Sequence, residues 1–208
     1  MDKVKMQIEI VRKNRLKRWR IVIKDKVYFY APRKMSDLLI NNAIAQYESW
    51  IKKSFSERDK IVREVENIYA QNSGKIPLFG EWVSAPENVK EFYKLTAQKF
   101  FNEFCEIYAE KTGVKYAKIT IKDQKTRYGS CSVKGSLNFN FRAVKAPKYV
   151  AEYLVAHEIA HLKHLNHGKN FWRLLSDIFP QYKEAESYLK NKRNALFLRY
   201  DNFGKKND

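Results

Sequence analysis

The stretch Val155-Ala156-His157-Glu158-Ile159-Ala160-His161-Leu162-Lys163-His164-Leu165-Asn166-His167 holds all four histidines of the 208-residue chain. His157 and His161 are four residues apart with Glu158 beside the first, which is the H-E-x-x-H pattern. On a helix that turns about 100° per residue, the two imidazoles lie within about 40° of each other on one face. The spacing therefore predicts that both side chains bind one metal ion.

The residues before the motif predict the helix that it needs. Pro147 suits a first helical turn, and Ala151, Val155, Ile159 and Leu162 recur at helical spacing. An apolar stripe of this kind packs against a core. The opposite face of the helix is then available for coordination.

His167 is the predicted third ligand, because a catalytic zinc has three protein ligands and one position for water. It lies six residues after His161, so the helix has to end before it. Asn166 and Gly168 tolerate the left-handed backbone that ends many helices, and we expect the stop there. The predicted cofactor is one Zn²⁺ per chain.

Glu158 neighbours a ligand but is rotated about 100° from it, so we expect it to be the general base and not a ligand. A reaction of this type also needs a group that stabilises the oxyanion. The candidates are Arg127, Tyr128 and His164; their alternative roles are surface charge, core aromatic and wall of the cleft. His164 is a poor ligand, because seven residues from His157 correspond to about 10.5 Å of helical rise.

Composition favours a globular protein, with 44% hydrophobic and 14% aromatic residues. No run of eighteen apolar residues is present, and residues 1–5 lack the apolar stretch of a secretory signal. We therefore expect no membrane span and a cytoplasmic location. The two cysteines, Cys105 and Cys131, fit no disulfide framework. Cys131 is read as a structural thiol, with an inhibitory approach to the zinc as the alternative.

The chain carries 41 basic and 23 acidic residues, for a net charge of +18. This charge favours nucleic acid or nucleotides as partners, although a generally lysine-rich composition also accounts for it. The densest cluster spans residues 12–20 and interleaves Trp19. Within it, Arg15, Lys17 and Arg18 are the predicted phosphate contacts, and a solvated hairpin is the alternative.

Periodicity and turn residues predict an N-terminal lobe of strands and helices. We expect strands at 6–11 and 19–30 in a hairpin or small sheet, a helix capped by Ser36 that runs through Ile51, and a second helix at 57–69. Residues 76–86, with two prolines and Gly80, form the strongest break in composition. The predicted domains are 1–75 and 76–208, unless the chain is one continuous domain.

The second lobe is predicted to be α+β, with a small sheet that borders a cleft beside the histidine helix. It should begin with a helix at 87–111 that ends at Gly113. The remaining expected elements are strands at 116–122, 126–132 and 136–142, with a turn at Lys134-Gly135, and helices at 170–178 and 182–193. The polar tail from Asn202 is expected to be frayed.

Two segments together resemble the YgjP-like zinc metallopeptidase family, which is related to the SprT-like proteases. They are Lys125-Thr126-Arg127-Tyr128-Gly129-Ser130-Cys131-Ser132 and the histidine motif continued through His167-Gly168-Lys169-Asn170-Phe171-Trp172. The resemblance implies a zincin-like fold, zinc on His157, His161 and His167, and Glu158 as the catalytic carboxylate. The family's usual Arg-Trp-Gly-Ser-Cys element reads Arg-Tyr-Gly-Ser-Cys in this chain.

Three hypotheses follow for function. The first is a zinc metallopeptidase that cleaves polypeptide substrates with zinc-activated water and Glu158 as base. The second is a metal-dependent hydrolase of nucleotide phosphoanhydride bonds, which the positive charge would favour. The third is a nucleic-acid-associated protein with a structural zinc. A Glu158 that does not bind the metal, together with an open coordination position on the metal, favours the first two hypotheses.

Overall fold

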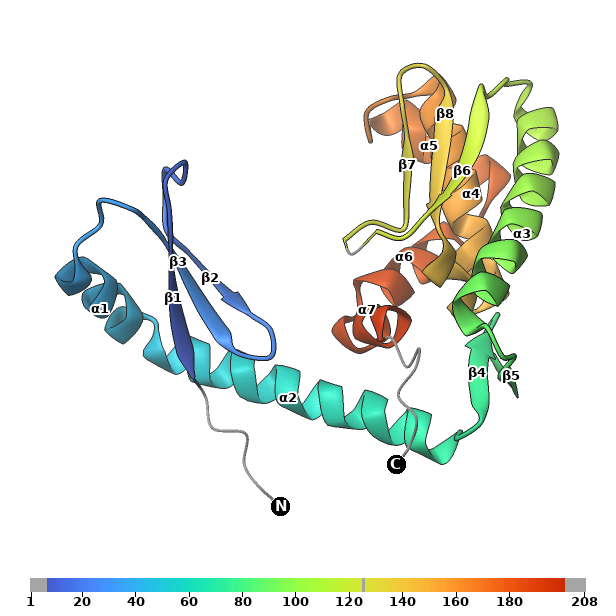
Figure 1. Ribbon diagram of the computed structural model, residues 1–208. Coiled ribbons are helices and arrows are strands. Elements are labelled where there is room, and N and C mark those ends of the chain that lie inside the picture. The colour runs from blue at the N-terminus through green and yellow to red at the C-terminus, as the bar shows by residue number, and fades with distance from the viewer. Residues whose placement is uncertain (1–6, 125, 201–208) are drawn as a thin grey trace. The chain divides into compact units, whose positions relative to one another are not determined.

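The computed structural model describes residues 7–124 and 126–200. The chain divides into two compact units, Met1–Glu66 and Asn67–Asp208, and each is described by itself. The mixture of helices and small sheets confirms the α+β class (Figure 1). The division falls inside a long helix, Glu48–Gln71 (α2), whereas the predicted domain boundary at 75/76 lies after that helix and stays a prediction.

The first unit contains a three-stranded sheet in the order β1-β3-β2. Its strands are β1 (Ile8–Lys13), β2 (Arg20–Ile23) and β3 (Val27–Pro32). The predicted small sheet is confirmed, but the single strand expected at 19–30 is wrong, because a turn in which Lys24 N donates to Lys26 O at 2.8 Å divides it. β1 and β3 are parallel, so the basic connector after β1 leads to the far edge strand.

Two helices pack on one face of this sheet. They are α1 (Asp37–Gln46) and α2 (Glu48–Gln71). Ser36 caps α1 as predicted, and its Oγ accepts from Leu39 N at 3.4 Å. The second helix begins at Glu48 and not at residue 57, because Tyr47 leaves the helical backbone conformation (φ −105°, ψ 11°). The buried residues shared by sheet and helices are Val27, Phe29, Ala31, Ile40, Ala43, Ile51 and Phe55.

The second unit contains a hairpin in the segment 76–86, which the sequence marks as the strongest break in composition. It is formed by β4 (Lys75–Leu78) and β5 (Glu81–Ser84). Phe79 and Gly80 at its turn both have positive φ (50° and 89°), which suits a two-residue hairpin loop. Pro77 is tolerated because each strand of a two-stranded sheet is an edge strand.

The helix α3 (Val89–Thr112) follows, and it ends as predicted at Gly113 in the left-handed conformation (φ 66°). The main sheet comes next, with the order β6-β8-β7. Its strands are β6 (Lys118–Lys122), β7 (Gly129–Cys131) and β8 (Ser136–Asn140). The β7–β8 hairpin is confirmed, but the strands are shorter than predicted. β8 ends where the chain tightens into a 3₁₀ helix, η1 (Phe141–Lys145).

Four helices complete the described part of the second unit. They are α4 (Lys148–Lys163), α5 (Lys169–Ile178), α6 (Tyr182–Lys190) and α7 (Lys192–Arg199). The single helix predicted at 182–193 is wrong, because Asn191 is extended and its Oδ1 accepts from Arg193 N at 2.9 Å, which starts α7. The tail predicted to fray from Asn202 lies outside the described residues.

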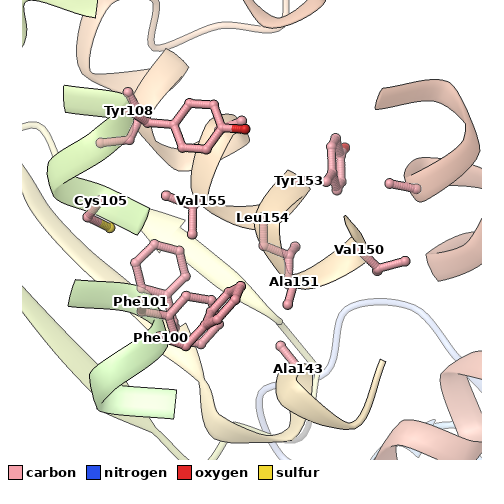
Figure 2. Packing of buried hydrophobic residues seen from close by; sticks show 14 of the residues in the cluster. Phe100, Phe101, Cys105, Tyr108, Ala143, Val150, Ala151, Tyr153, Leu154 and Val155 are labelled. Atoms are coloured by element: carbon pink, nitrogen blue, oxygen red, sulfur yellow. The ribbon is translucent and has the colours of Figure 1, made fainter. Parts of the chain in front are cut away.

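The helices α3 and α4 cover the same face of the main sheet. Phe101 of α3 stacks on Phe139 of β8, with ring centroids 4.3 Å apart. Phe139 is the register partner of Gly129 on β7, and Gly129 contacts Glu158 of α4. Figure 2 shows the side chains of α3 and α4 that meet in this core. The histidine helix is therefore fixed against both the sheet and α3.

Within the described ranges, no helix has the length and apolar character that crossing a bilayer requires.

Candidate metal centre

Three of the four histidines converge at the end of α4. One ring nitrogen from each of His157, His161 and His167 lies within 4.8 Å of the others. The Nε2 atoms of His157 and His167 are 3.1 Å apart. Two nitrogens bound at zinc distance to one tetrahedral ion would be about 3.3 Å apart. The imidazoles of His157 and His167 thus already have nearly the spacing that a shared zinc ion requires.

The other ring nitrogens of the two helical histidines are held by the protein. Nδ1 of His157 lies 3.2 Å from the hydroxyl of Tyr153, and Nδ1 of His161 lies 3.1 Å from the carbonyl oxygen of His164. In the tautomer in which Nδ1–H donates to these oxygens, Nε2 is free to bind metal. We did not identify Tyr153 from the sequence, although its position four residues before His157 places it on the same helical face.

The turn after α4 brings His167 back to the pair. The predicted left-handed stop at Asn166 or Gly168 is wrong. The helix ends because His164 adopts an extended backbone (φ −134°, ψ 98°), and Gly168 is extended as well (φ −80°, ψ −179°). Gly168 then serves as the N-cap of α5. Among the described residues, those with positive φ all lie outside this turn.

Phe171 on α5 forms the base of the cluster. It is fully buried, and its ring centroid lies 5.0, 4.6 and 4.7 Å from those of His157, His161 and His167. Packing against one rigid ring restricts the rotation of all three imidazoles. Phe171 was part of the segment that carries the family resemblance, but the sequence alone did not show this contact.

Burial keeps the helical imidazoles neutral. It lowers the pKa of His157 to about 3, with smaller contributions from His161 and His167. Burial also lowers the pKa of His161, against the opposing hydrogen bond to the backbone of His164. A metal ligand has to be the neutral imidazole, so these directions suit coordination.

Glu158 points into the protein, where it lies against β7. It is 4% exposed, and burial raises its pKa to about 8. A β-carbon at Gly129 would lie 2.5 Å from Oε1 of Glu158 and 3.1 Å from its Cδ, so only glycine fits beside the carboxyl group. Among the described residues, the buried Oε2 of Glu158 has no hydrogen-bond partner. A buried oxygen of this kind is costly unless another polar group binds it.

We expect Gly129→Ala to lower hydrolytic activity by about 10²-fold, because a displacement of about 1 Å at a catalytic group can cost that much. The added methyl group would displace the Glu158 carboxyl from its position. Gly168→Ala is the matched control, since a β-carbon there meets no atom within 4 Å. The measurement is activity at equal zinc content. Equal rates for the two variants would show that the contact with Gly129 does not position Glu158.

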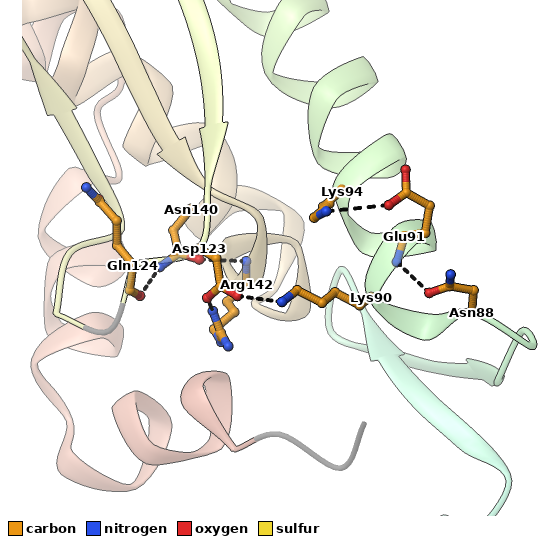
Figure 3. A network of polar contacts seen from close by, with 8 residues as sticks. All are labelled: Asn88, Lys90, Glu91, Lys94, Asp123, Gln124, Asn140 and Arg142. Carbon is orange, nitrogen blue, oxygen red and sulfur yellow. Dashed lines mark hydrogen bonds and ion pairs between the residues drawn. The ribbon is translucent and has the colours of Figure 1, made fainter. Parts of the chain in front are cut away.

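A polar network holds the segment that leads into β7 (Figure 3). Asp123 forms an ion pair with Arg142 and lies 2.9 Å from Lys90. Burial opposes ionisation of Asp123, but the hydrogen bonds from Arg142 and Lys90 outweigh it and lower its pKa. Nδ2 of Asn140 donates to the carbonyl oxygens of Gln124 and Arg127, at 2.5 and 2.9 Å. The network fixes the backbone just before Gly129.

The three predicted oxyanion candidates lie outside the histidine cluster. Arg127 is exposed, and its carbonyl is the part held by the network. The hydroxyl of Tyr128 donates to the carbonyl of Ala195 in α7 at 3.5 Å, and the Arg199 guanidinium lies 5.4 Å from the Tyr128 ring. His164 supports His161 through its backbone carbonyl. Their proposed roles in catalysis stay predictions.

Cys131 also lies outside the metal cluster. Burial raises the pKa of its thiol to about 11, and the Glu158 charge adds to the shift. A thiol with a raised pKa is a weak metal ligand near neutral pH. The structural and the inhibitory role of Cys131 both stay predictions.

A groove of about 430 Å³ borders His161. It lies among the end of α4, the β7–β8 turn and the segment between α3 and β6. Its lining residues include Lys115, Tyr116, Lys134, His161, Leu162 and Leu165. The groove thus offers an apolar floor with two cationic side chains beside a candidate metal ligand.

The predicted nucleic-acid contacts belong to the other unit. Arg15, Lys17 and Arg18 are exposed on the connector between β1 and β2. They are not part of the histidine cluster.

Comparison with known proteins identifies the family of the chain. A family model described as YgjP-like, metallopeptidase domain, matches residues 84–192. Among solved structures, the chain is similar to the metallopeptidase zymogen abylysin of Pyrococcus abyssi, at 25% identity and a TM-score of 0.39, over 42% of this chain and 89% of that one. No curated protein matches the chain. Since the family model spans more than half of the sequence and contains the whole histidine cluster, the chain belongs to the YgjP-like metallopeptidase family.

Proposed function

We propose that the protein is a zinc-dependent peptidase of zincin-like architecture, with zinc on His157, His161 and His167 and Glu158 as general base. Its family is a metallopeptidase family and implies a metal cofactor. The observation that carries the proposal is the convergence of three imidazoles, with Glu158 next to His157 in the chain and, among the described residues, without a hydrogen-bond partner for its buried Oε2. Three nitrogen ligands of this kind suit zinc and leave one position open.

The protein's own side chains fix the ligands before any metal binds. Tyr153 and the His164 carbonyl orient the two helical imidazoles through Nδ1, and Phe171 limits the rotation of all three. Such outer contacts are worth about 10–100-fold in metal affinity. Zinc, when bound, supplies a Lewis acid that polarises a carbonyl group and acidifies water.

Glu158 accepts the proton of the attacking water and delivers it to the leaving amine. Its Oε2, which has no hydrogen-bond partner within the described part of the chain, is available for that hydrogen bond. Burial alone favours the protonated carboxyl group, but a cation on the neighbouring histidines would favour the carboxylate that acts as base. Gly129 keeps space for the carboxyl group at the edge of the sheet.

The groove beside His161 supports a preference for anionic groups in the substrate. Lys115 and Lys134 line it, together with the apolar side chains of Leu162 and Leu165. An acidic polypeptide segment would meet both kinds of surface. The same two lysines favour the second candidate function, hydrolysis of a nucleotide phosphoanhydride bond, because they would bind a polyphosphate.

An activity screen with zinc-loaded protein tests the proposal. Unfolded casein is offered in parallel with the four nucleoside triphosphates, and new peptide termini and released phosphate are measured by mass spectrometry and a phosphate assay. We expect cleavage of casein that stops with 1,10-phenanthroline and returns with added zinc. Phosphate release without peptide cleavage would favour the phosphoanhydride hydrolase. Metal binding with neither activity would favour a structural zinc.

A further inference from the structure

The outer face of the N-terminal sheet carries two tyrosines. On β3, Val27, Phe29 and Ala31 are fully buried against the helices, whereas Tyr28 and Tyr30 alternate with them and are only partly buried. The Tyr28 and Tyr30 rings are 6.2 Å apart between centroids, at an angle of 25°. The α1 and α2 residues that belong to the hydrophobic clusters of this unit all pack against the face of the sheet that carries Phe29. The tyrosine rings form a flat aromatic surface on the opposite face.

Cations flank both rings. The Arg20 guanidinium lies 5.1 Å from the centroid of Tyr30, and the Lys24 ammonium lies 5.7 Å from that of Tyr28. The register places Arg20 opposite Tyr30 on the neighbouring strand. Each ring therefore has a positive charge over one of its faces.

Two acidic side chains, Glu9 and Asp25, lie near Tyr28. Glu9, the register partner of Tyr28 on β1, lies 3.8 Å from the Lys26 ammonium. Asp25 accepts a hydrogen bond from the Tyr28 hydroxyl at 3.2 Å. Burial, followed by the charge of Asp25, raises the pKa of Tyr28.

A basic groove lies at one end of the sheet, next to the carboxyl ends of β1 and β3. β1 and β3 are parallel, so their carboxyl ends meet, and the β1–β2 connector starts there. The groove has a volume of about 440 Å³ and is lined by Arg12, Lys13, Asn14 and Arg33. Arg12 is engaged with Asp37 at 2.5 Å, while Lys13 and Arg33 add charge beside the exposed connector.

We propose that this face binds single-stranded nucleic acid. Bases stack on Tyr28 and Tyr30, and phosphates contact Arg20, Lys24 and the basic groove. Aromatic rings flanked by cations bind single strands without strong sequence preference, because every base has a π-face and every linkage a negative charge. In a duplex the bases are already stacked on one another, so the tyrosines would contribute little. The inference concerns the first unit and does not depend on the metal centre.

Fluorescence anisotropy with the full-length protein tests the proposal. The probes are fluorescein-labelled oligo(dT), oligo(rU) and a duplex DNA of the same length. We expect both single strands to bind more tightly than the duplex. The double variant Tyr28→Leu/Tyr30→Leu should bind single strands at least tenfold more weakly, in line with the loss of base stacking. Tyr28→Phe/Tyr30→Phe keeps the rings and should bind as the wild type does.

The salt dependence of binding distinguishes the contribution of the charged side chains from that of base stacking. Neutralising Arg20 and Lys24 to glutamine should reduce the slope of log K against log salt by about 1.4, since a single strand contributes about 0.7 per phosphate contact. The leucine variant should keep the wild-type slope. Lys53→Gln/Lys60→Gln on α2 removes the same charge elsewhere in the unit and should change neither quantity.

Three results would overturn the proposal: equal affinity for duplex and single strand, unchanged affinity in the leucine variant, or binding only to vesicles that contain phosphatidylserine. Circular dichroism establishes that each variant is folded. Should the leucine variant unfold, photocrosslinking of wild-type protein to bromouracil-substituted oligonucleotide decides the question. Crosslinks at Tyr28 or Tyr30 support the site, and crosslinks confined to other residues contradict it.

Discussion

Glu158→Gln is expected to keep about one equivalent of zinc and to lower hydrolysis by about 10²–10⁴-fold, the range that a general base contributes. Glutamine is nearly isosteric, so it fits the space beside Gly129 that the carboxyl group occupies. Its amide cannot accept a proton from water near neutral pH. The expected loss is in kcat, because in the proposed site the substituted side chain is the general base and not a ligand, and it does not line the groove beside His161.

The zinc content of this variant is measured by elemental analysis and its turnover under substrate saturation. Glu158→Asp is the matched comparison, since it keeps the carboxylate but shortens the side chain, and it should retain more activity than the glutamine variant. A structural zinc protein would be unaffected by either change. Loss of zinc in Glu158→Gln, as severe as in a histidine variant, would identify the carboxylate as a ligand or as an element of the fold.

The convergence of the histidines could be predicted from the sequence because it depends on local geometry. Four residues on a helix place His157 and His161 on one face whatever the rest of the chain does. The return of His167 required only that α4 end before it. The way in which α4 ends was predicted wrongly, because backbone preferences of Asn166 and Gly168 allow a left-handed turn but do not require one. His164 ends the helix by adopting an extended conformation.

The features that the sequence did not reveal depend on distant contacts. Parallel pairing of β1 with β3 joins residues separated by the whole of β2, and no local pattern specifies it. Residues 76–86 contain prolines that usually mark a loop, yet a two-residue turn at Phe79 and Gly80 makes them a hairpin. The close approach of Gly129 to Glu158 likewise needs β7 to lie on α4, and this requires the assembled core.

His161→Ala is expected to remove bound zinc and to reduce hydrolysis to the background of metal-free protein. The His161 imidazole is one of the three converging rings, and the His164 carbonyl oxygen holds its Nδ1. Alanine offers no atom that could bind the metal in its place. A ligand that binds only the folded state raises the unfolding temperature. Added zinc should therefore stabilise the wild type in a thermal unfolding scan and leave His161→Ala unchanged, which is a readout independent of activity.

His164→Ala provides the control one turn further along the chain. It removes an imidazole from the same segment but retains the backbone carbonyl that orients His161, so zinc content and thermal stabilisation should stay near wild type. His167→Ala should be intermediate, because this residue is exposed and water can enter the position that it leaves. Full zinc occupancy in His167→Ala would mean that the third ligand lies elsewhere, with Glu184 or Glu186 of α6 as the next to replace. Loss of zinc in His164→Ala would show that the fourth imidazole is itself a ligand and that the three-histidine assignment is wrong.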